Sequence, residues 1–201
     1  MIQKKNEVTN NEKEDARTIR SKRDLANALE ELLQEKNYDE IGIKDITDRA
    51  LVSKNTFYNN FNEKNDLLCF IFQRYEETLM KEVKPFLDKT IHATRYIFFS
   101  KCIDTVVHFF YAGKLPIQKM IQHDDSHALY YELSAFIKDL LIKLDRNYNY
   151  ILSSKLNTKV SSIFYSGAFT SMIYFSLKDN VEISEKDLLK SIKIMTFPVV
   201  E

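Results

Sequence analysis

Residues 38–68 read YDEIGIKDITDRALVSKNTFYNNFNEKNDLL, and this segment carries the clearest structural signal in the chain. Its apolar spacing predicts two short helices, one on each side of Leu51-Val52, and each helix has one buried face. Gly42 and Ser53 stand where the two helices begin, and Ser is a favoured N-cap because its hydroxyl accepts a backbone hydrogen bond. Two such short helices cannot bury a core alone, so the preceding helix must complete a three-helix helix-turn-helix unit.

The second short helix exposes an unusual set of side chains when Phe57 and Phe61 face inward. The outward set is Lys54, Asn55, Thr56, Tyr58, Asn59 and Asn60. Amide and hydroxyl groups can hydrogen-bond to base edges, and Asn pairs well with adenine. Asn is a poor helix former, so several Asn residues in one short helix would be unusual on a surface with only a structural role. The pattern favours a DNA-reading helix and leaves a solvated helix face as the alternative.

The segment before this motif supplies the third helix and a local positive charge. Residues 1–15 have no periodicity and predict a disordered arm, whereas helical spacing runs from about Ala16 to Asn37. Residues 16–66 hold nine basic and ten acidic side chains, so DNA binding depends on a local cluster. A solvated charge cluster is the alternative. The basic residues at the start of this helix are Arg17, Arg20, Lys22 and Arg23.

This region resembles the DNA-binding region of TetR-family regulators over about residues 16–70. The matching elements, in the family's order and spacing, are Ile43-Lys44-Asp45-Ile46, Arg49-Ala50, Val52-Ser53-Lys54, Thr56-Phe57-Tyr58, Phe61, Lys64 and Leu67-Leu68. The resemblance implies an all-α protein of about nine helices. A three-helix DNA-binding domain over 16–66 precedes a helical dimerisation and possible ligand-binding domain over 67–201.

The resemblance also implies roles for single residues. Those implied to contact DNA are Lys44, Ser53, Lys54, Asn55, Thr56, Tyr58, Asn59, Asn60, Lys64, Arg17 and Arg20. Those implied to face the groove are Lys54, Asn55, Thr56 and Asn59. Those implied to contact phosphates or the DNA backbone are Tyr58, Asn60, Lys44 and Lys64.

Four positions depart from the family pattern, and two of them are Asn59 and Asn60, the second of which stands where His or Tyr is frequent. Leu51 stands where the turn usually has Gly, and a positive φ there would cost about 1 kcal/mol. Gly42 replaces a common Thr, which removes one possible hydroxyl-to-phosphate bond. These departures bear on the operator sequence and on affinity, and they leave the expected fold unchanged.

The rest of the chain predicts further helices. Apolar residues make up 44% of the sequence, with only three Gly and three Pro, which favours long helices over a sandwich or barrel. Pro85 should interrupt or end a long helix that starts at residue 62 or 63. The following helices are expected at about 91–112, 116–122, 126–148, 153–178 and 184–197. Ser184 should cap the last one, with Asp187 three residues on.

Aromatic residues are frequent in this second part, and most of them should be core. Some are candidates to line a pocket for a small apolar or aromatic effector. The candidate ligand-binding residues are Phe98, Phe109, Tyr130, Phe136 and Phe169.

The stretch from Ile163 to Leu188 resembles the last helices of one TetR branch, some members of which have little or no known pocket. The resemblance implies a homodimer formed by the last two helices. Small side chains that would let helices approach closely are Ser161, Ser162, Ser166, Gly167, Ala168 and Ser171.

Other functional classes find little support. Cys69 and Cys102 lie in apolar runs and are expected as buried free thiols. The polar N-terminus and broken apolar runs predict neither a secretory signal nor a membrane span, hence a cytoplasmic location. We find no catalytic constellation or nucleotide loop, and we expect no enzyme activity and no cofactor. His123 and His127 leave metal binding open, although the residues between them are more typical of a helix boundary.

The sequence therefore predicts a DNA-binding regulator. We expect a ligand-responsive repressor that binds a palindromic operator as a homodimer. The alternative is a TetR-like co-regulator that works through protein partners without binding DNA.

Overall fold

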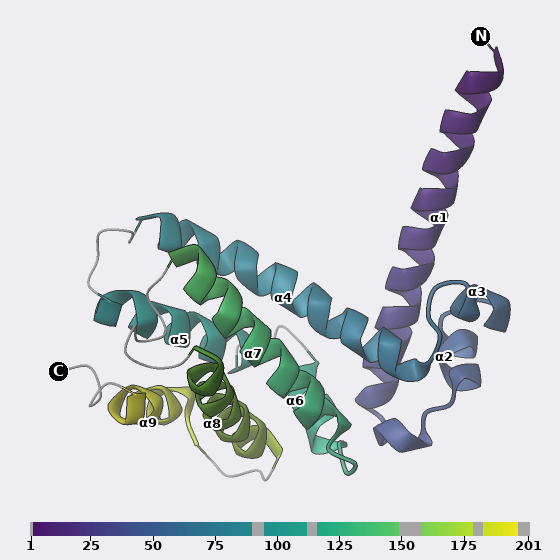
Figure 1. Ribbon diagram of the computed structural model, residues 1–201. Helices are drawn as coiled ribbons and strands as arrows, with labels where there is room; N and C mark the ends of the chain where they lie inside the picture. Colours follow the sequence, from purple (N-terminus) through teal and green to yellow (C-terminus); the bar gives the residue numbers. More distant parts are fainter. Residues whose placement is uncertain (1, 90–94, 112–115, 149–157, 179–182, 197–201) are drawn as a thin grey trace. The chain divides into compact units, whose positions relative to one another are not determined.

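The computed structural model describes residues 2–89, 95–111, 116–148, 158–178 and 183–196. Within these ranges all regular elements are helices, which confirms the all-α prediction (Figure 1). The chain divides into two compact units, Met1–Ile71 and Phe72–Glu201. The predicted boundary lay at residues 66 and 67, so the first unit takes in one more turn of helix than we expected.

The first unit is built from three helices, a short 3-10 helix and the start of a fourth helix. These elements are α1 (Ile2–Leu33), the 3-10 helix η1 (Tyr38–Glu40), α2 (Ile43–Arg49), α3 (Lys54–Tyr58) and α4 (Lys64–Lys89). α2 and α3 pack on each other and on α1, and Figure 1 shows them beside its C-terminal end. The side chains with no exposed surface at the centre of this unit include Leu25, Leu29, Ile46, Phe57, Leu67 and Leu68.

Helix α1 begins at Ile2, whereas we predicted a disordered arm over residues 1–15. No Gly or Pro occurs before Gly42, and residues 1–15 include three Lys and three Glu. Lys and Glu have good helix propensity, so the helix continues although apolar periodicity is missing and the segment also holds three Asn.

Helix α4 passes through Pro85 and ends at Lys89, so the prediction that Pro85 interrupts or ends it is wrong. Proline lacks one backbone donor and disfavours a helix interior by about 3 kcal/mol. The other turns of this 26-residue helix outweigh that penalty.

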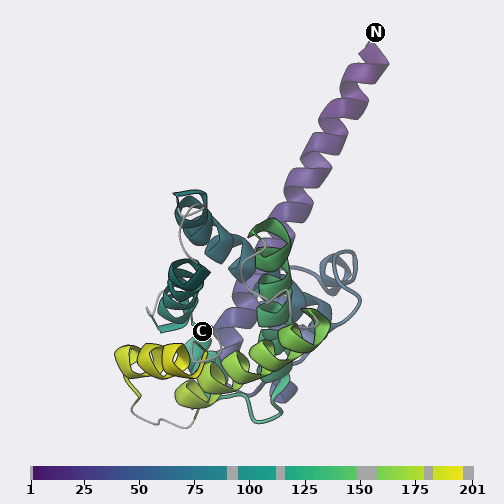
Figure 2. The same cartoon turned by 60° about the vertical axis from the view of Figure 1, so that its left-hand side comes forward.

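The second unit contains the rest of α4 and five more described helices. These are α5 (Arg95–Tyr111), α6 (Ile117–Gln122), α7 (Ala128–Tyr148), α8 (Thr158–Lys178) and α9 (Glu185–Thr196). The main packing pairs are α7 with α8, α5 with α9 and α6 with α8. In Figure 1 and Figure 2, α8 and α9 lie on the same side of this unit.

The caps and ion pairs of the second unit fit the predicted boundaries. Ser184 Oγ accepts a hydrogen bond from Asp187 N at 3.1 Å and donates to Asp187 Oδ2 at 2.7 Å, which confirms the predicted cap of α9. An ion pair between Lys193 and Asp104 ties α9 to α5. Of the described helices, none has the length and apolarity required to span a membrane.

Candidate nucleic-acid interface

The turn between α2 and α3 has a left-handed residue at its centre. Leu51 has φ 55°, as its position in the motif implied. Leu51 N donates to Asp48 O at 3.3 Å and Val52 N donates to Thr47 O at 3.0 Å, the hydrogen-bond pattern of a Schellman helix end. The Leu51 side chain is 92% exposed, so no packing offsets the strain of about 1 kcal/mol.

The start of α2 is held by a carboxylate. Gly42 is the N-cap, as expected, and its backbone N–H donates to Asp45 Oδ2 at 2.8 Å. This bond, with the Lys36 ammonium at 3.3 Å, lowers the pKa of Asp45. Asp45 therefore fixes the first turn of α2 and leaves Lys44 exposed beside it.

Ser53 caps α3 as predicted. Its Oγ accepts from Thr56 N at 3.1 Å and lies 2.9 Å from Thr56 Oγ1. Thr56 is half-buried, and its hydroxyl already has a partner at the helix start. The cap sets the direction in which α3 leaves the turn.

Aromatic packing fixes which face of α3 is exposed. Phe57 is fully buried and Phe61 is 7% exposed, which confirms the predicted inward pair. The Tyr58 ring meets Phe57 edge-on at 5.5 Å between centroids, while Tyr58 itself is 55% exposed. Phe61 packs further against Phe70 at 5.6 Å. Rotation of α3 would bury Tyr58 and expose Phe57, so the outward face is strongly specified.

The outward face is made of polar side chains in one short run. Its exposed members are Ser53, Lys54, Asn55, Tyr58 and Asn59. α3 is shorter than the predicted 53–60: it ends at Tyr58, and Asn59 is its C-cap. Asn60 is half-buried, and its Nδ2 donates to Thr56 O at 2.7 Å. One of its two amide hydrogens is thus engaged within the helix end.

The four basic residues between Arg17 and Arg23 on α1 differ in their contacts within the protein. Arg17 and Arg20 are exposed on α1. The Lys22 ammonium lies about 6 Å from the centres of the Phe61 and Phe70 rings, and Arg23 pairs with Asp24 at 2.9 Å. The first two are therefore the members best placed for a phosphate.

Lys64 is turned toward the protein. Its Nζ donates to Tyr38 O at 2.5 Å and to Ile41 O at 2.8 Å, and it lies 3.9 Å from the centre of the Tyr38 ring. The predicted contact with the DNA backbone remains a prediction, and the structure adds an internal role that sequence reasoning missed.

A second feature that sequence reasoning missed joins α1 to α2. The Arg49 guanidinium makes two hydrogen bonds to the Glu35 carboxylate, at 2.8 and 2.9 Å, and a third to Glu31 at 3.3 Å. These bonds raise the pKa of Arg49 and lower that of Glu35. Glu31 and Glu35 are four residues apart in the helix predicted over about Ala16–Asn37, and that spacing was the available signal.

In the second unit, the structure separates the predicted ligand-binding residues. Phe169 lines a small cavity, but Phe109 and Phe136 pack into an aromatic cluster around Phe110. Tyr130 lies elsewhere, with its hydroxyl 3.1 Å from Ser171 Oγ. The Phe98 side chain lies outside the described residues.

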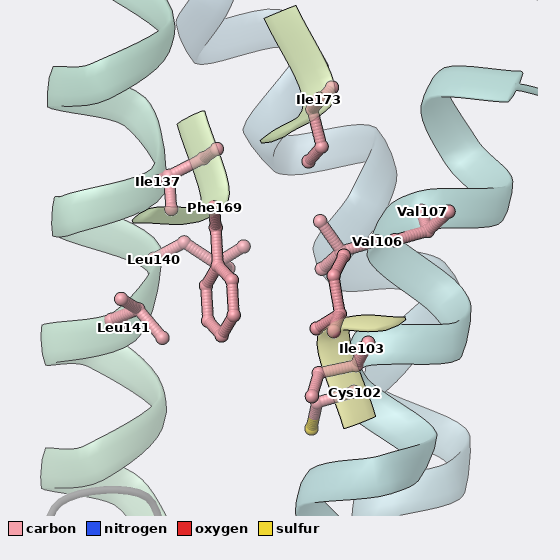
Figure 3. A pocket seen from close by; sticks show the side chains of 10 residues that line it. Cys102, Ile103, Val106, Val107, Ile137, Leu140, Leu141, Phe169 and Ile173 are labelled. Atoms are coloured by element: carbon pink, nitrogen blue, oxygen red, sulfur yellow. The ribbon is translucent and has the colours of Figure 1, made fainter. Parts of the chain in front are cut away.

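The cavity itself has about 30 Å³ of free space and an apolar lining (Figure 3). Figure 3 shows the Phe169 ring between the side chains of α7 and those of α5. The lining residues are Cys102, Ile103, Val106, Val107, Ile137, Leu140, Leu141, Phe169, Ile173 and Ile192. Burial raises the pKa of the Cys102 thiol to about 12, which keeps it protonated and inert. Our prediction missed this lining because it followed aromatic residues, and the site is mostly aliphatic.

The two histidines do not share a helix face. His123 is the C-cap of α6, and its Nδ1 lies 2.9 Å from Lys119 O. His127 has φ 60° and precedes α7. Between them, Asp124 Oδ2 accepts from Leu129 N at 3.0 Å and marks a helix boundary. The described ranges contain no group of three His, Cys, Asp or Glu residues able to hold a metal.

Helix α8 has a row of exposed apolar side chains, called here the apolar stripe. Some of the small residues that we expected at the dimer interface are not exposed with it. Ser161, Ser162 and Ser166 are buried within the chain's own fold, which corrects our expectation for them. Apart from the neighbouring residues and backbone of its own helix, no atom lies within 4 Å of a Cβ added at Gly167. The exposed apolar residues of α8 and α9 are Val160, Ile163, Phe164, Phe175, Ile194 and Met195.

The geometry of the first unit is that of a helix-turn-helix DNA-binding protein. Residues 25–69 match the family model described as bacterial regulatory proteins, tetR family. This segment therefore has the DNA-binding region typical of TetR-family transcription regulators, as the resemblance implied. A curated relative, the HTH-type dhaKLM operon transcriptional activator DhaS of Lactococcus lactis, is 33% identical over 57 residues. That match covers 28% of this chain and 30% of the relative.

Similar solved structures extend the likeness in fold to both units. A TetR transcriptional regulator from Streptococcus agalactiae has a TM-score of 0.62 at 22% identity and covers 91% of this chain and 97% of its own. The dihydroxyacetone kinase operon activator DhaS gives 0.57 at 17% identity, over 90% and 98%. AibR, solved with isovaleryl coenzyme A and operator DNA, gives 0.51 at 14% identity, over 89% and 98%.

Proposed function

We propose that the protein binds a palindromic operator as a homodimer and regulates transcription in response to a small apolar effector. The observation that supports DNA reading most directly is the outward face of α3. Ser53 caps that helix, buried Phe57 fixes its rotation, and Lys54, Asn55 and Asn59 are left exposed. These are side chains that pair with guanine, adenine or phosphate in a major groove.

The stripe on α8 and α9 supports the homodimer. Phe164 is 68% exposed and Met195 is 69% exposed, and such apolar surface is unfavourable in water. The open space at Gly167 would let a second copy of α8 approach closely. A twofold dimer of standard size would bury about 1,600 Å² in total and would present two α3 helices to half-sites about one DNA turn apart.

The cavity supports an apolar effector. A space of about 30 Å³ holds little more than one methyl group, so a ligand must widen it by moving its walls. Ile192 of α9 is one of those walls, and α9 belongs to the proposed dimer surface. AibR, which is similar in fold, was solved in complex with isovaleryl coenzyme A and operator DNA, and this supports the proposal. A ligand that binds one arrangement more tightly would shift the population of DNA-binding dimers.

We infer repression as the default outcome, because a protein that occupies an operator blocks access to overlapping promoter DNA. Activation is the competing outcome, since both relatives called DhaS are described as activators. Selection of genomic fragments by the purified protein would identify the operator. Transcription from that promoter, with and without the protein, would then distinguish the two outcomes. Failure to enrich any sequence would overturn the proposed function in favour of a co-regulator that acts through protein partners.

A further inference from the structure

Lys64, the first residue of α4, makes three close contacts through its ammonium group. Nζ donates to Tyr38 O and Ile41 O, and it lies 3.9 Å from the centre of the Tyr38 ring. A lysine ammonium has three donors, and a ring face is an acceptor for a cation. Two of its three donors are thus bonded to the protein's own backbone, and the aromatic ring is a further contact for its charge.

The surroundings of Lys64 also disfavour a DNA phosphate. Partial burial lowers its pKa, while the carboxylates of Asp39 and Asp45 act on its charge from nearby. A phosphate would compete with these carboxylates for the charge of the ammonium. Because Asp45 is also paired with Lys36 at 3.3 Å, the bonds from Lys64 to the two carbonyl groups are the stronger reason against a phosphate contact.

What Lys64 holds is the chain just before α2. Tyr38 is 8% exposed and Ile41 is 2% exposed, so both ends of this segment are anchored in the core of the unit. Ile41 directly precedes Gly42, whose N–H is bonded to Asp45 at the start of α2. The contacts of Lys64 span 23 and 26 residues of sequence, and they fix the start of α4 relative to the start of α2.

We propose that Lys64 is a positioning residue that sets the N-terminus of α2, with exposed Lys44, for contact with the DNA backbone, and does not itself bind phosphate. The proposal rests on the proposed DNA binding. A phosphate-binding lysine and a positioning lysine differ in salt dependence, because each neutralised phosphate contributes about 0.9 to the slope of log affinity against log salt.

The test measures operator affinity of the full-length protein at several salt concentrations. We expect Lys64→Met to lower affinity about tenfold or more at every salt concentration with an unchanged slope. The control Lys44→Met should reduce the slope by about 0.9. A loss of about 0.9 in the Lys64→Met slope would overturn the proposal. Circular dichroism at the assay temperature checks that each variant is folded.

Lys64→Arg keeps the charge and serves if Lys64→Met fails to fold. A planar guanidinium does not reproduce the two carbonyl bonds of a compact ammonium, so we expect weakened binding with an unchanged slope. Affinity equal to the parent would indicate a phosphate contact and overturn the proposal.

A double-mutant cycle separates positioning from a purely structural role. If Lys64 acts through the start of α2, Lys44→Met should cost clearly less affinity in the Lys64→Met background than in the parent. Additive effects, or lower stability with parental affinity, would contradict positioning. Absence of operator binding by the parent protein would overturn the proposed function instead, so the two failures are distinguishable.

Discussion

Leu51 occupies a turn position where TetR-family proteins usually have Gly, and this difference should lower the stability of the folded state. It has φ 55° and a side chain that is 92% exposed, so its backbone is strained and its side chain adds little packing. We predict that Leu51→Gly raises the free energy of unfolding by about 1 kcal/mol. Leu51→Ala is the matched control, because it removes the side chain but retains the strain. Equal stability of the Gly and Ala variants in denaturant titrations would show that the turn is unstrained.

Phe57 and Tyr58 are adjacent residues with opposite expected roles. Phe57→Ala leaves a cavity in the core of the first unit and should destabilise it by about 3–5 kcal/mol. Tyr58→Phe should leave the melting temperature nearly unchanged because Tyr58 is 55% exposed and keeps its ring. If its hydroxyl bonds a phosphate, affinity should fall to a similar degree on every operator variant. A change in base preference would instead assign Tyr58 to sequence reading.

At the scale of elements, the Arg49 bridge should make the packing of α1 on α2 sensitive to acid. The hydrogen bonds from Arg49 lower the pKa of Glu35 below its usual 4.5. The native state therefore favours the ionised carboxylate, and its contribution to stability is present above pH 4.5 and is lost as pH falls through the lowered pKa. Glu35→Gln should show a smaller loss of stability below pH 4.5 than the parent.

Arg49→Met is the companion variant, because it removes the cause of the shift. Its acid dependence should match that of Glu35→Gln, as measured by thermal melts between pH 3 and 7. Parental acid dependence in either variant would show that the pair has no role in stability.

The positions of the helices show how much of the fold can be predicted from the sequence. Apolar periodicity located the helices, and cap chemistry placed Gly42, Ser53 and Ser184 at their starts. The extension of α1 to Ile2 escaped prediction because propensity continues where periodicity stops. The inward direction of Lys64 depends on carbonyl groups far away in sequence, which no local pattern reveals.

At the scale of the whole molecule, assembly should depend on the stripe of α8. Gly167→Leu adds a side chain where the protomer leaves open space, so the fold of one chain should tolerate it. We predict that it shifts the protein from dimer to monomer in light scattering at micromolar concentration, with little loss of helical content. Ser166→Leu is a contrasting control, since Ser166 is buried and the change should damage the protomer itself. A dimeric Gly167→Leu variant would place the interface elsewhere.

Sequence reading by α3 is the central claim, and the most direct measurement is competitive binding of Asn55→Ala and Asn59→Ala to matched and single-base-mismatched operators at fixed salt. Both side chains are exposed on the outward face of α3. Each variant should lose about 1–3 kcal/mol of discrimination at one or two base positions and keep parental affinity for unrelated DNA. Parental discrimination at every position in both variants would contradict the claim that these two residues read sequence.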